Sequence, residues 1–263
     1  MVSNKENISN LYHYTTFEAL DSIIKTGCLY ISPLDEKLND KNEYKYLPEY
    51  DKGKIYISCF TSQMNDNFWH KEDYAKTTKK GVCIKFNVSE LIKLQIKTFT
   101  GQTLELCDRS IFNYTTCSEE SDFGYDIAML KKVIYVDDPT KYPICDKKQF
   151  QFYNGCCNIN NEELRTFCTT IPHFSYVKAK IDANGNDQSY EKEYRIIVRI
   201  RAKMSAIGWG LRNYEKPQKP FERLLLDIKP IKGLLEVFIN KDFEYTEEMI
   251  KLSNDYGFKY III

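Results

Sequence analysis

The chain has 263 residues, of which 43% are hydrophobic and 28% charged, and its 37 basic side chains balance its 37 acidic ones. This length suits one large domain or two small ones, and such a chain buries roughly 70 to 75% of its unfolded surface, enough for a core without disulfides. Zero net charge gives no overall attraction to nucleic acid, although it leaves room for a local basic patch.

The cysteines predict a reducing environment. The chain contains nine, an odd number, with no CxxC pair, and residues 1–10 include no apolar core of a signal peptide. No apolar run approaches the roughly 18 residues that a membrane span needs. We therefore expect a cytoplasmic protein that contacts no membrane. Cys156, Cys157, Cys168 and His173 form a loose group whose spacing fits no usual zinc site, so no metal is predicted.

The first elements follow clear local signals. Residues 11–14 are expected to form a strand, and Thr15 with Glu18 has the capping-box spacing that begins a helix. Apolar residues then recur at helical spacing up to Gly27, which fits a C-terminal cap. Residues 28–32 are expected to form a second strand, and the polar segment 35–51 is expected to be mainly loop.

The remaining elements are predicted from the same kinds of pattern. β-branched and aromatic residues predict strands, and apolar residues at helical spacing predict helices. The expected strands are 54–60, 81–86, 132–136, 190 to about 201, 234–240 and 258–263; the expected helices are 89–96, parts of 161–180, and 246–256.

Strands and helices do not alternate regularly, which favours an α+β fold over a doubly wound sheet. We expect mixed, mainly antiparallel sheets with flanking helices. No repeat or long linker divides the chain, so residues 1–263 are predicted to form one domain, with the polar segment 97–130 as a candidate insertion.

The segment YEKEYR at 190–195 is the most informative for chemistry. On a strand, residues two apart share a face, so Glu191, Glu193 and Arg195 are expected to project together. Two carboxylates beside a guanidinium can form a charged site in which the carboxylate pKa values differ. Taken alone, however, the pattern favours an exposed face on which the three charges are solvated.

Two other regions are candidates for ligand contact. His13 ends an aromatic-flanked strand just before a helix, a place where ligands often bind, and a core histidine with one satisfied nitrogen is the alternative. The loop 33–43, with Trp69 and Tyr74, can shape a pocket for a flat heterocycle, or Trp69 can fill a small core.

Several motifs in order resemble one bacterial family. They are LYHYT at 11–15, the Asn39-Asp40 loop, SCF at 58–60, the Trp69/Tyr74 region, GVCI at 81–84 and YEKEYR at 190–195. They are similar to a widespread family with no assigned activity, whose members carry YHYT, a Met-Asn-Asp loop, Cys-Phe, Gly-Val-Cys-Ile and Tyr-Glu-x-Glu-Trp-Arg. That family in turn resembles a remote branch of the ADP-ribosyltransferase superfamily.

The resemblance implies an ADP-ribosyltransferase-like fold, NAD as the substrate, and roles for individual residues. His13 matches the histidine that holds a ribose hydroxyl near nicotinamide, and Glu193 matches the acid that binds the ribose 2′-hydroxyl and stabilises positive charge at the anomeric carbon. Glu191 completes a Glu-x-Glu pair that orients the acceptor, and Arg195 pairs with Glu193 or reaches a phosphate. Tyr14 and Thr15 adjoin His13 in the expected NAD-binding region.

The stacking tyrosine of the superfamily has no clean match, and Tyr30, Tyr56 and Tyr74 remain open, with Trp69 as a further aromatic contact. The chain departs from the family pattern at Leu38, Lys41 and Tyr194, where Met, Pro and Trp are expected.

The function expected from the resemblance is an ADP-ribosyltransferase or NAD glycohydrolase acting on an unknown acceptor, as a toxin or phage-defence effector. The alternatives are a catalytically inactive nucleotide-binding or interaction module of the same fold, and a nucleic-acid-modifying transferase, which the neutral charge does not favour.

Overall fold

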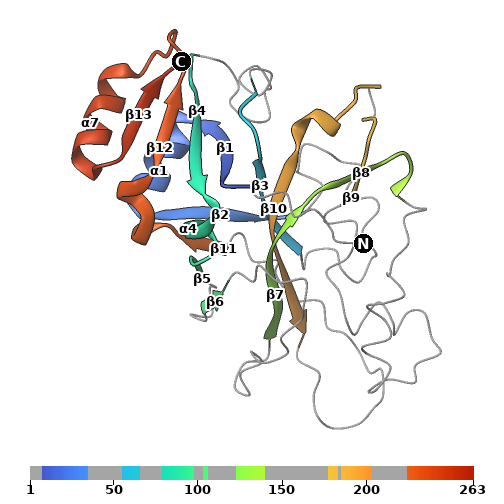
Figure 1. Ribbon diagram of the computed structural model, residues 1–263. Coiled ribbons are helices and arrows are strands. Elements are labelled where there is room, and N and C mark those ends of the chain that lie inside the picture. The colour runs from blue at the N-terminus through green and yellow to red at the C-terminus, as the bar shows by residue number, and fades with distance from the viewer. Residues whose placement is uncertain are drawn as a thin grey trace, which may run out of the picture.

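The computed structural model describes residues 8–34, 55–65, 79–97, 103–105, 123–139, 177–182, 185–202 and 224–263. Within these residues the fold is mixed α+β: an 11-stranded, mostly antiparallel sheet, a separate two-stranded sheet and a few helices (Figure 1). The predicted α+β class with a mainly antiparallel sheet is thus confirmed. The loop 35–51 and residues 161–176 of the predicted helical region 161–180 lie outside the described residues. At the end of that region the helical prediction is wrong, because Val177–Ala179 form a strand that pairs with residues 134–136.

Strands outnumber helices in this part of the chain. The strands are β1 (Asn10–Thr16), β2 (Cys28–Pro33), β3 (Ile55–Thr61), β4 (Gly81–Asn87), β5 (Gln95–Lys97), β6 (Thr103–Glu105), β7 (Phe123–Lys132), β8 (Ile134–Val136), β9 (Val177–Ala179), β10 (Glu193–Ala202), β11 (Leu224–Asp227), β12 (Glu236–Ile239) and β13 (Lys259–Ile262). The helices are α1 (Phe17–Thr26), α4 (Val88–Leu91) and α7 (Thr246–Tyr256), with short 3₁₀ turns η3 (Ser189–Glu191) and η4 (Lys229–Leu234).

The large sheet branches at β3. Along one side of β3, all seven residues pair with β10, which in turn pairs with β7. Along the other side, β3 pairs with β1 only at Thr61 and with β2 only at Ile57 and Tyr56. One half of the sheet therefore continues from β1 through β4 and β12 to β13, and the other from β2 through β11 and β5 to β6.

Helix α1 forms where the sequence predicts it, with one shift at its start. The N-cap is Thr16, whose hydroxyl accepts a hydrogen bond from the N–H of Ala19, and not Thr15 as the capping-box spacing suggested. Thr15 is instead paired with Val82 inside β1, because the strand continues two residues past the predicted end. The C-cap is Gly27, as predicted, with φ of 68°.

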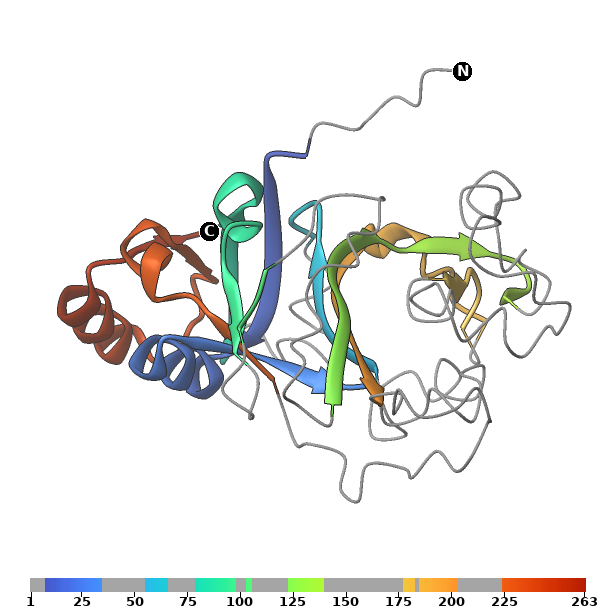
Figure 2. The same ribbon diagram turned by 90° about the horizontal axis from the view of Figure 1, so that it is seen from below.

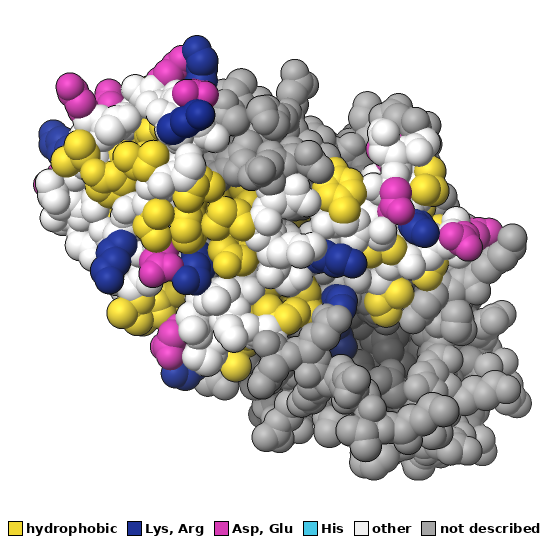
Figure 3. Space-filling model, turned by 45° about the horizontal axis from the view of Figure 1, so that its top comes forward, with side chains coloured by type: hydrophobic (Ala, Val, Ile, Leu, Met, Phe, Trp, Pro, Cys, Tyr) yellow, Lys and Arg dark blue, Asp and Glu magenta, His cyan; other side chains and the backbone are white. Residues whose placement is uncertain are grey.

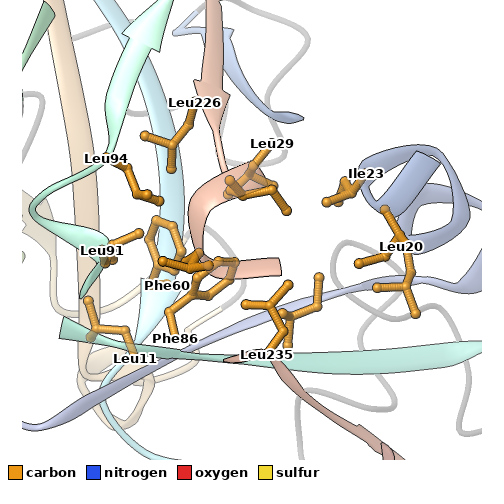
Figure 4. Close-up of a cluster of buried hydrophobic side chains, with 14 of the residues drawn as sticks. Leu11, Leu20, Ile23, Leu29, Phe60, Phe86, Leu91, Leu94, Leu226 and Leu235 are labelled. Carbon is orange, nitrogen blue, oxygen red and sulfur yellow. The ribbon is translucent and has the colours of Figure 1, made fainter. Parts of the chain in front are cut away.

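The core lies between the helices and one face of the sheet. Phe60 and Phe86 meet edge to face with ring centroids 5.7 Å apart, and leucines from β1, α1, β2, α4 and β11 belong to the same cluster (Figure 4). Helix α7 adds Met249 and Leu252 to the same cluster. Helices α1 and α7 therefore both cover this face, which we call the core face; the opposite face of β1, β3 and β10 carries the candidate site.

Other boundaries differ from the predictions. The expected helix 89–96 ends at Leu91 as α4, and 95–97 form β5, since Ile96 is fully buried between β11 and β6. Strand β7 covers 123–132, so it overlaps the end of the segment 97–130 considered as an insertion, and it pairs with β10. Strand β11 was not predicted. The helix 246–256 is confirmed.

Two helix-ending glycines give a test of backbone strain. Gly27 and Gly257 both have positive φ, 68° and 74°, but a Cβ on Gly27 would lie 2.4 Å from Cγ of Lys229, whereas nothing lies within 4 Å at Gly257. We expect Gly257→Ala to lower the free energy of unfolding by about 1 kcal/mol, the cost of a left-handed residue with a side chain. Gly27→Ala should cost more, because Lys229 must also move. Urea unfolding of both variants checks this, and equal losses would contradict it.

Candidate functional site

Register places three residues of different strands in one row. Tyr12 of β1 pairs with Thr61 of β3, and Thr61 pairs with Glu193 of β10. Directly opposed residues of antiparallel strands share a face, so these three side chains project to the same side of the sheet. Because side chains alternate along a strand, Tyr14 and Arg195 lie on that side as well.

A shallow recess opens at this row. Its cavity volume is about 10 Å³, roughly the space that one water molecule needs. We call it the tyrosine recess; its lining residues are Tyr12, Tyr14, Cys59, Phe60, Thr61, Glu191 and Glu193. The described residues thus bring aromatic rings and two carboxylates to one small opening at the surface of the sheet.

The approach to β10 is a tight turn and not a strand. The sequence predicted a strand from Tyr190, but residues 189–191 form η3 and Lys192 adopts φ of 46° before β10 begins at Glu193. The hydroxyl of Thr61 donates a 2.6 Å hydrogen bond to the carbonyl of Glu191, and the N–H of Ser62 bonds the carbonyl of Lys192. The turn is therefore fastened to the end of β3.

The turn buries both glutamates beside two cations. Arg195 donates to Glu193 through Nε at 2.6 Å and through Nη2 at 3.2 Å. The ammonium of Lys178, from β9, lies 3.2 Å from Glu193 Oε2 and 3.4 Å from Glu191 Oε2. All four side chains are at most 6% exposed. We call this group the buried charge cluster; its two negative and two positive charges compensate each other.

This arrangement corrects one expectation. The pattern of YEKEYR alone favoured a solvated charged face, yet Glu191, Glu193 and Arg195 are all buried. Burial of unpaired charges is costly, and it is tolerated here because each carboxylate has a cation within ion-pairing distance. Lys178, which the sequence did not single out, supplies half of the positive charge.

Glu193 stays ionised in this environment. Burial by itself would raise its pKa, but Arg195 and then Lys178 outweigh burial and hold the pKa of Glu193 at about 2. A carboxylate with so low a pKa is a poor proton donor or base near neutral pH. It is suited to accepting hydrogen bonds and to stabilising positive charge.

The small sheet is anchored at the same place. Strands β8 and β9 pair in parallel, and their inward side chains, Tyr135 and Lys178, both reach Glu191. Burial and the charge of Glu193 raise the pKa of Tyr135, so its hydroxyl stays protonated. The charge cluster therefore connects the two-stranded sheet to the large one. The ribbon views show the backbone of β8 continuing from the end of β7, beside the large sheet (Figures 1 and 2).

His13 and Thr15 lie on the other face of β1. Alternation separates them from Tyr12 and Tyr14, and neither lines the tyrosine recess in the described residues. Nδ1 of His13 bonds the carbonyl of Cys59 at 2.9 Å, where β1 and β3 have diverged, and its ring is 5.5 Å from Phe60. His13 thus spans the branch point of the sheet, which agrees with the alternative of a structural histidine.

The other predicted site residues are spread out. Tyr14 lines the recess, and its hydroxyl both donates to the carbonyl and accepts from the N–H of Asn65. Tyr56 is fully buried in the core, and Tyr30 pairs with Leu225 of β11, away from the recess. Trp69 and Tyr74 lie outside the described residues.

Sequence reasoning missed Tyr12, Thr61, Cys59, Lys178 and Tyr135. Tyr12 could have been identified from the sequence, because residues two apart on a strand share a face and Tyr14 was already a candidate site residue. Lys178 and Tyr135 could not have been identified in this way, since they come from distant segments whose positions depend on the packing of β8 and β9.

Within the described residues, no group of three or more His, Cys, Asp or Glu side chains is arranged to hold a metal ion, and Cys156, Cys157, Cys168 and His173 fall outside this part of the chain. In the same residues, no helix combines the length and hydrophobicity needed to cross a bilayer.

Comparison of the chain with protein-family models, with curated proteins and with solved structures finds no match.

The histidine at the branch point predicts a pH dependence. Desolvation lowers the pKa of His13 from its ordinary value of 6.5, against a smaller opposite effect of the Cys59 hydrogen bond. The folded chain therefore favours the neutral ring, and this stability is complete above pH 6.5 and is lost as the pH falls toward the lower folded pKa. We expect the melting temperature to decrease from about pH 7 to pH 5. His13→Gln, which retains a donor for Cys59, should decrease less; parallel curves for both proteins would contradict the assignment.

The turn before β10 predicts a position-specific effect of substitution. Lys192 is exposed but has φ of 46°, which a β-branched residue adopts only with strain. Lys192→Val should lower the free energy of unfolding by about 2 kcal/mol. Lys192→Asn and Lys192→Gly should change it by less than about 1 kcal/mol, because both residues accept this conformation. Similar losses in all three, measured by urea unfolding, would show that the lysine side chain matters instead.

Proposed function

We propose that the chain is an NAD-consuming enzyme, an ADP-ribosyltransferase or NAD glycohydrolase, with the nicotinamide end of NAD docking against the rim of the tyrosine recess. The observation that carries the proposal is the ionised carboxylate of Glu193 at an opening lined by Tyr12 and Tyr14. The ordered motifs from LYHYT to YEKEYR support the same superfamily.

The chemistry of the recess suits this ligand. The nicotinamide ring of NAD is flat and positively charged, and a tyrosine face attracts such a ring by its quadrupole. Glu193 and Glu191 line the same opening, whereas the buried cations that balance them, Arg195 and Lys178, do not line it. Because the carboxylates and not the cations of the cluster line the opening, the recess favours a cationic aromatic group over an anionic one.

The proposed reaction breaks the bond between C1′ of the ribose and the nitrogen of nicotinamide. Nicotinamide leaves with the bonding electron pair, which leaves positive charge on C1′ and the ring oxygen. Glu193 accepts a hydrogen bond from a ribose hydroxyl and stabilises that charge. The acceptor, or water in a glycohydrolase, then adds an oxygen or nitrogen lone pair to C1′ and releases a proton, and Glu191 orients it.

One observation favours a second function, a nucleotide-binding module without turnover. Glu193 already accepts two hydrogen bonds from Arg195 and one from Lys178. A carboxylate has about four acceptor positions, so these bonds leave little capacity for a ribose hydroxyl. Under this proposal the charge cluster is structural, and NAD or a related nucleotide binds at Tyr12 and Tyr14 without losing nicotinamide.

Nicotinamide release from NAD by the purified chain, with cell lysate as a source of acceptors, distinguishes the two functions. For an enzyme, Glu193→Gln should reduce release by about 100-fold or more, as expected for loss of one charge-stabilising group. If folded protein binds NAD but releases no nicotinamide even with lysate present, the enzyme proposal is wrong and the binding-module proposal is supported.

Glu193→Gln can fail to fold, because it leaves Arg195 and Lys178 buried without their carboxylate, at a cost of about 3–5 kcal/mol. Tyr12→Ala therefore carries the test independently, since Tyr12 is only partly buried. It should reduce release about tenfold, whereas the matched control Tyr256→Ala, on α7, should not. A third variant, His13→Gln, tests the role of His13. Full activity in this variant would show that His13 takes no part in the reaction.

A further inference from the structure

Strand β13 is one edge of the large sheet and is unusually apolar for an edge. It pairs in parallel with β12 on one side only, and the described residues contain no partner on the other. Ile261, Ile262 and Ile263 are 37%, 56% and 45% exposed. Figure 3 shows hydrophobic side chains gathered on the part of the surface that includes β12 and β13.

The backbone of β13 offers hydrogen-bonding groups that β12 does not use. Lys259 and Ile263 donate their N–H groups to the carbonyls of Leu235 and Ile239, so residues 259, 261 and 263 direct their backbone groups toward β12. Tyr260 and Ile262 consequently direct theirs outward. The edge presents two N–H donors and two C=O acceptors, alternating at the spacing of a further strand.

Natural sheets usually protect such an edge with charged residues, proline or a bulge. Here the only charged side chain of the strand is Lys259, and residues 259–262 contain no proline and pair with β12 without a shift in register. A sheet edge with three exposed isoleucines is a template for pairing with another strand.

We propose that β13 pairs in antiparallel fashion with β13 of a second copy of this chain, which joins the two sheets into one. The outward backbone groups determine the register. In this register Tyr260 of each copy forms a hydrogen-bonded pair with Ile262 of the other. No other register uses all four outward donors and acceptors of both strands. The two-fold axis then passes through Ile261, which faces its own equivalent.

This register is also favourable for the side chains. Lys259 lies opposite Ile263 and not opposite the second Lys259, so no like charges meet. Tyr260 opposes Ile262 on the core face, and aromatic and β-branched residues form favourable cross-strand pairs. A second copy thus satisfies the backbone, the charge and the apolar side chains of the edge together.

A site-specific cross-link tests the register. In a non-hydrogen-bonded antiparallel pair the Cα atoms are about 4.5 Å apart, within disulfide range. Ile261→Cys should therefore yield a covalent dimer on mild oxidation. Ile262→Cys, whose equivalent lies opposite residue 260, should yield much less, and the native chain gives the background from its own cysteines. Equal cross-linking of both variants, or none above background, would overturn the proposed pairing.

Light scattering after size exclusion, over a range of concentrations, tests the dimer without a cross-link. The native chain should show twice the chain mass, and Ile262→Pro should show the chain mass, because proline removes an outward N–H that β12 does not use. Ile262→Val, which keeps that N–H, should stay dimeric, and circular dichroism checks that both variants fold. A monomeric native chain, or a dimer that persists in Ile262→Pro, would overturn the proposal.

Discussion

Mutual neutralisation of Glu191, Glu193, Arg195 and Lys178 is the constraint on which the rest of the site depends. None of these charges can be buried alone, because an uncompensated ion in a dry interior costs several kcal/mol. The requirement explains why β10 begins with a tight turn, why a lysine accepts a left-handed backbone there, and why the β8–β9 sheet is held against the large one.

The two faces of β1 have different roles in this region. Tyr12 and Tyr14 belong to the tyrosine recess, whereas His13 supports the point where β1 and β3 separate. A strand gives adjacent residues opposite environments, so the single motif LYHYT serves two structural purposes. At the recess, a ligand would meet Tyr12 and Tyr14 beside two carboxylates, Glu191 and Glu193. Both carboxylates already form ion pairs within the protein.

Local patterns predicted much of the fold. The strands at β3 and β4, the Gly27 cap and helix α7 follow from β-branched runs, glycine at a helix end and apolar periodicity. The site was predictable only in part: Glu191, Glu193 and Arg195 were identified, but their burial was not, because it depends on Lys178 arriving from another sheet. Ile96 shows the same limit, since its place in β5 is set by β11 and β6 and not by its neighbours in sequence.

The pairing of β3 with β10 has a consequence during synthesis. Thr61 and Glu191 are 130 residues apart, so β10 leaves the ribosome long after β3 does. Until then the apolar segment IYISCFT lacks its principal neighbour, and a strand with such an unprotected side readily joins other chains. We therefore expect the folding yield to depend on how well this segment is kept from other chains until β10 has been synthesised.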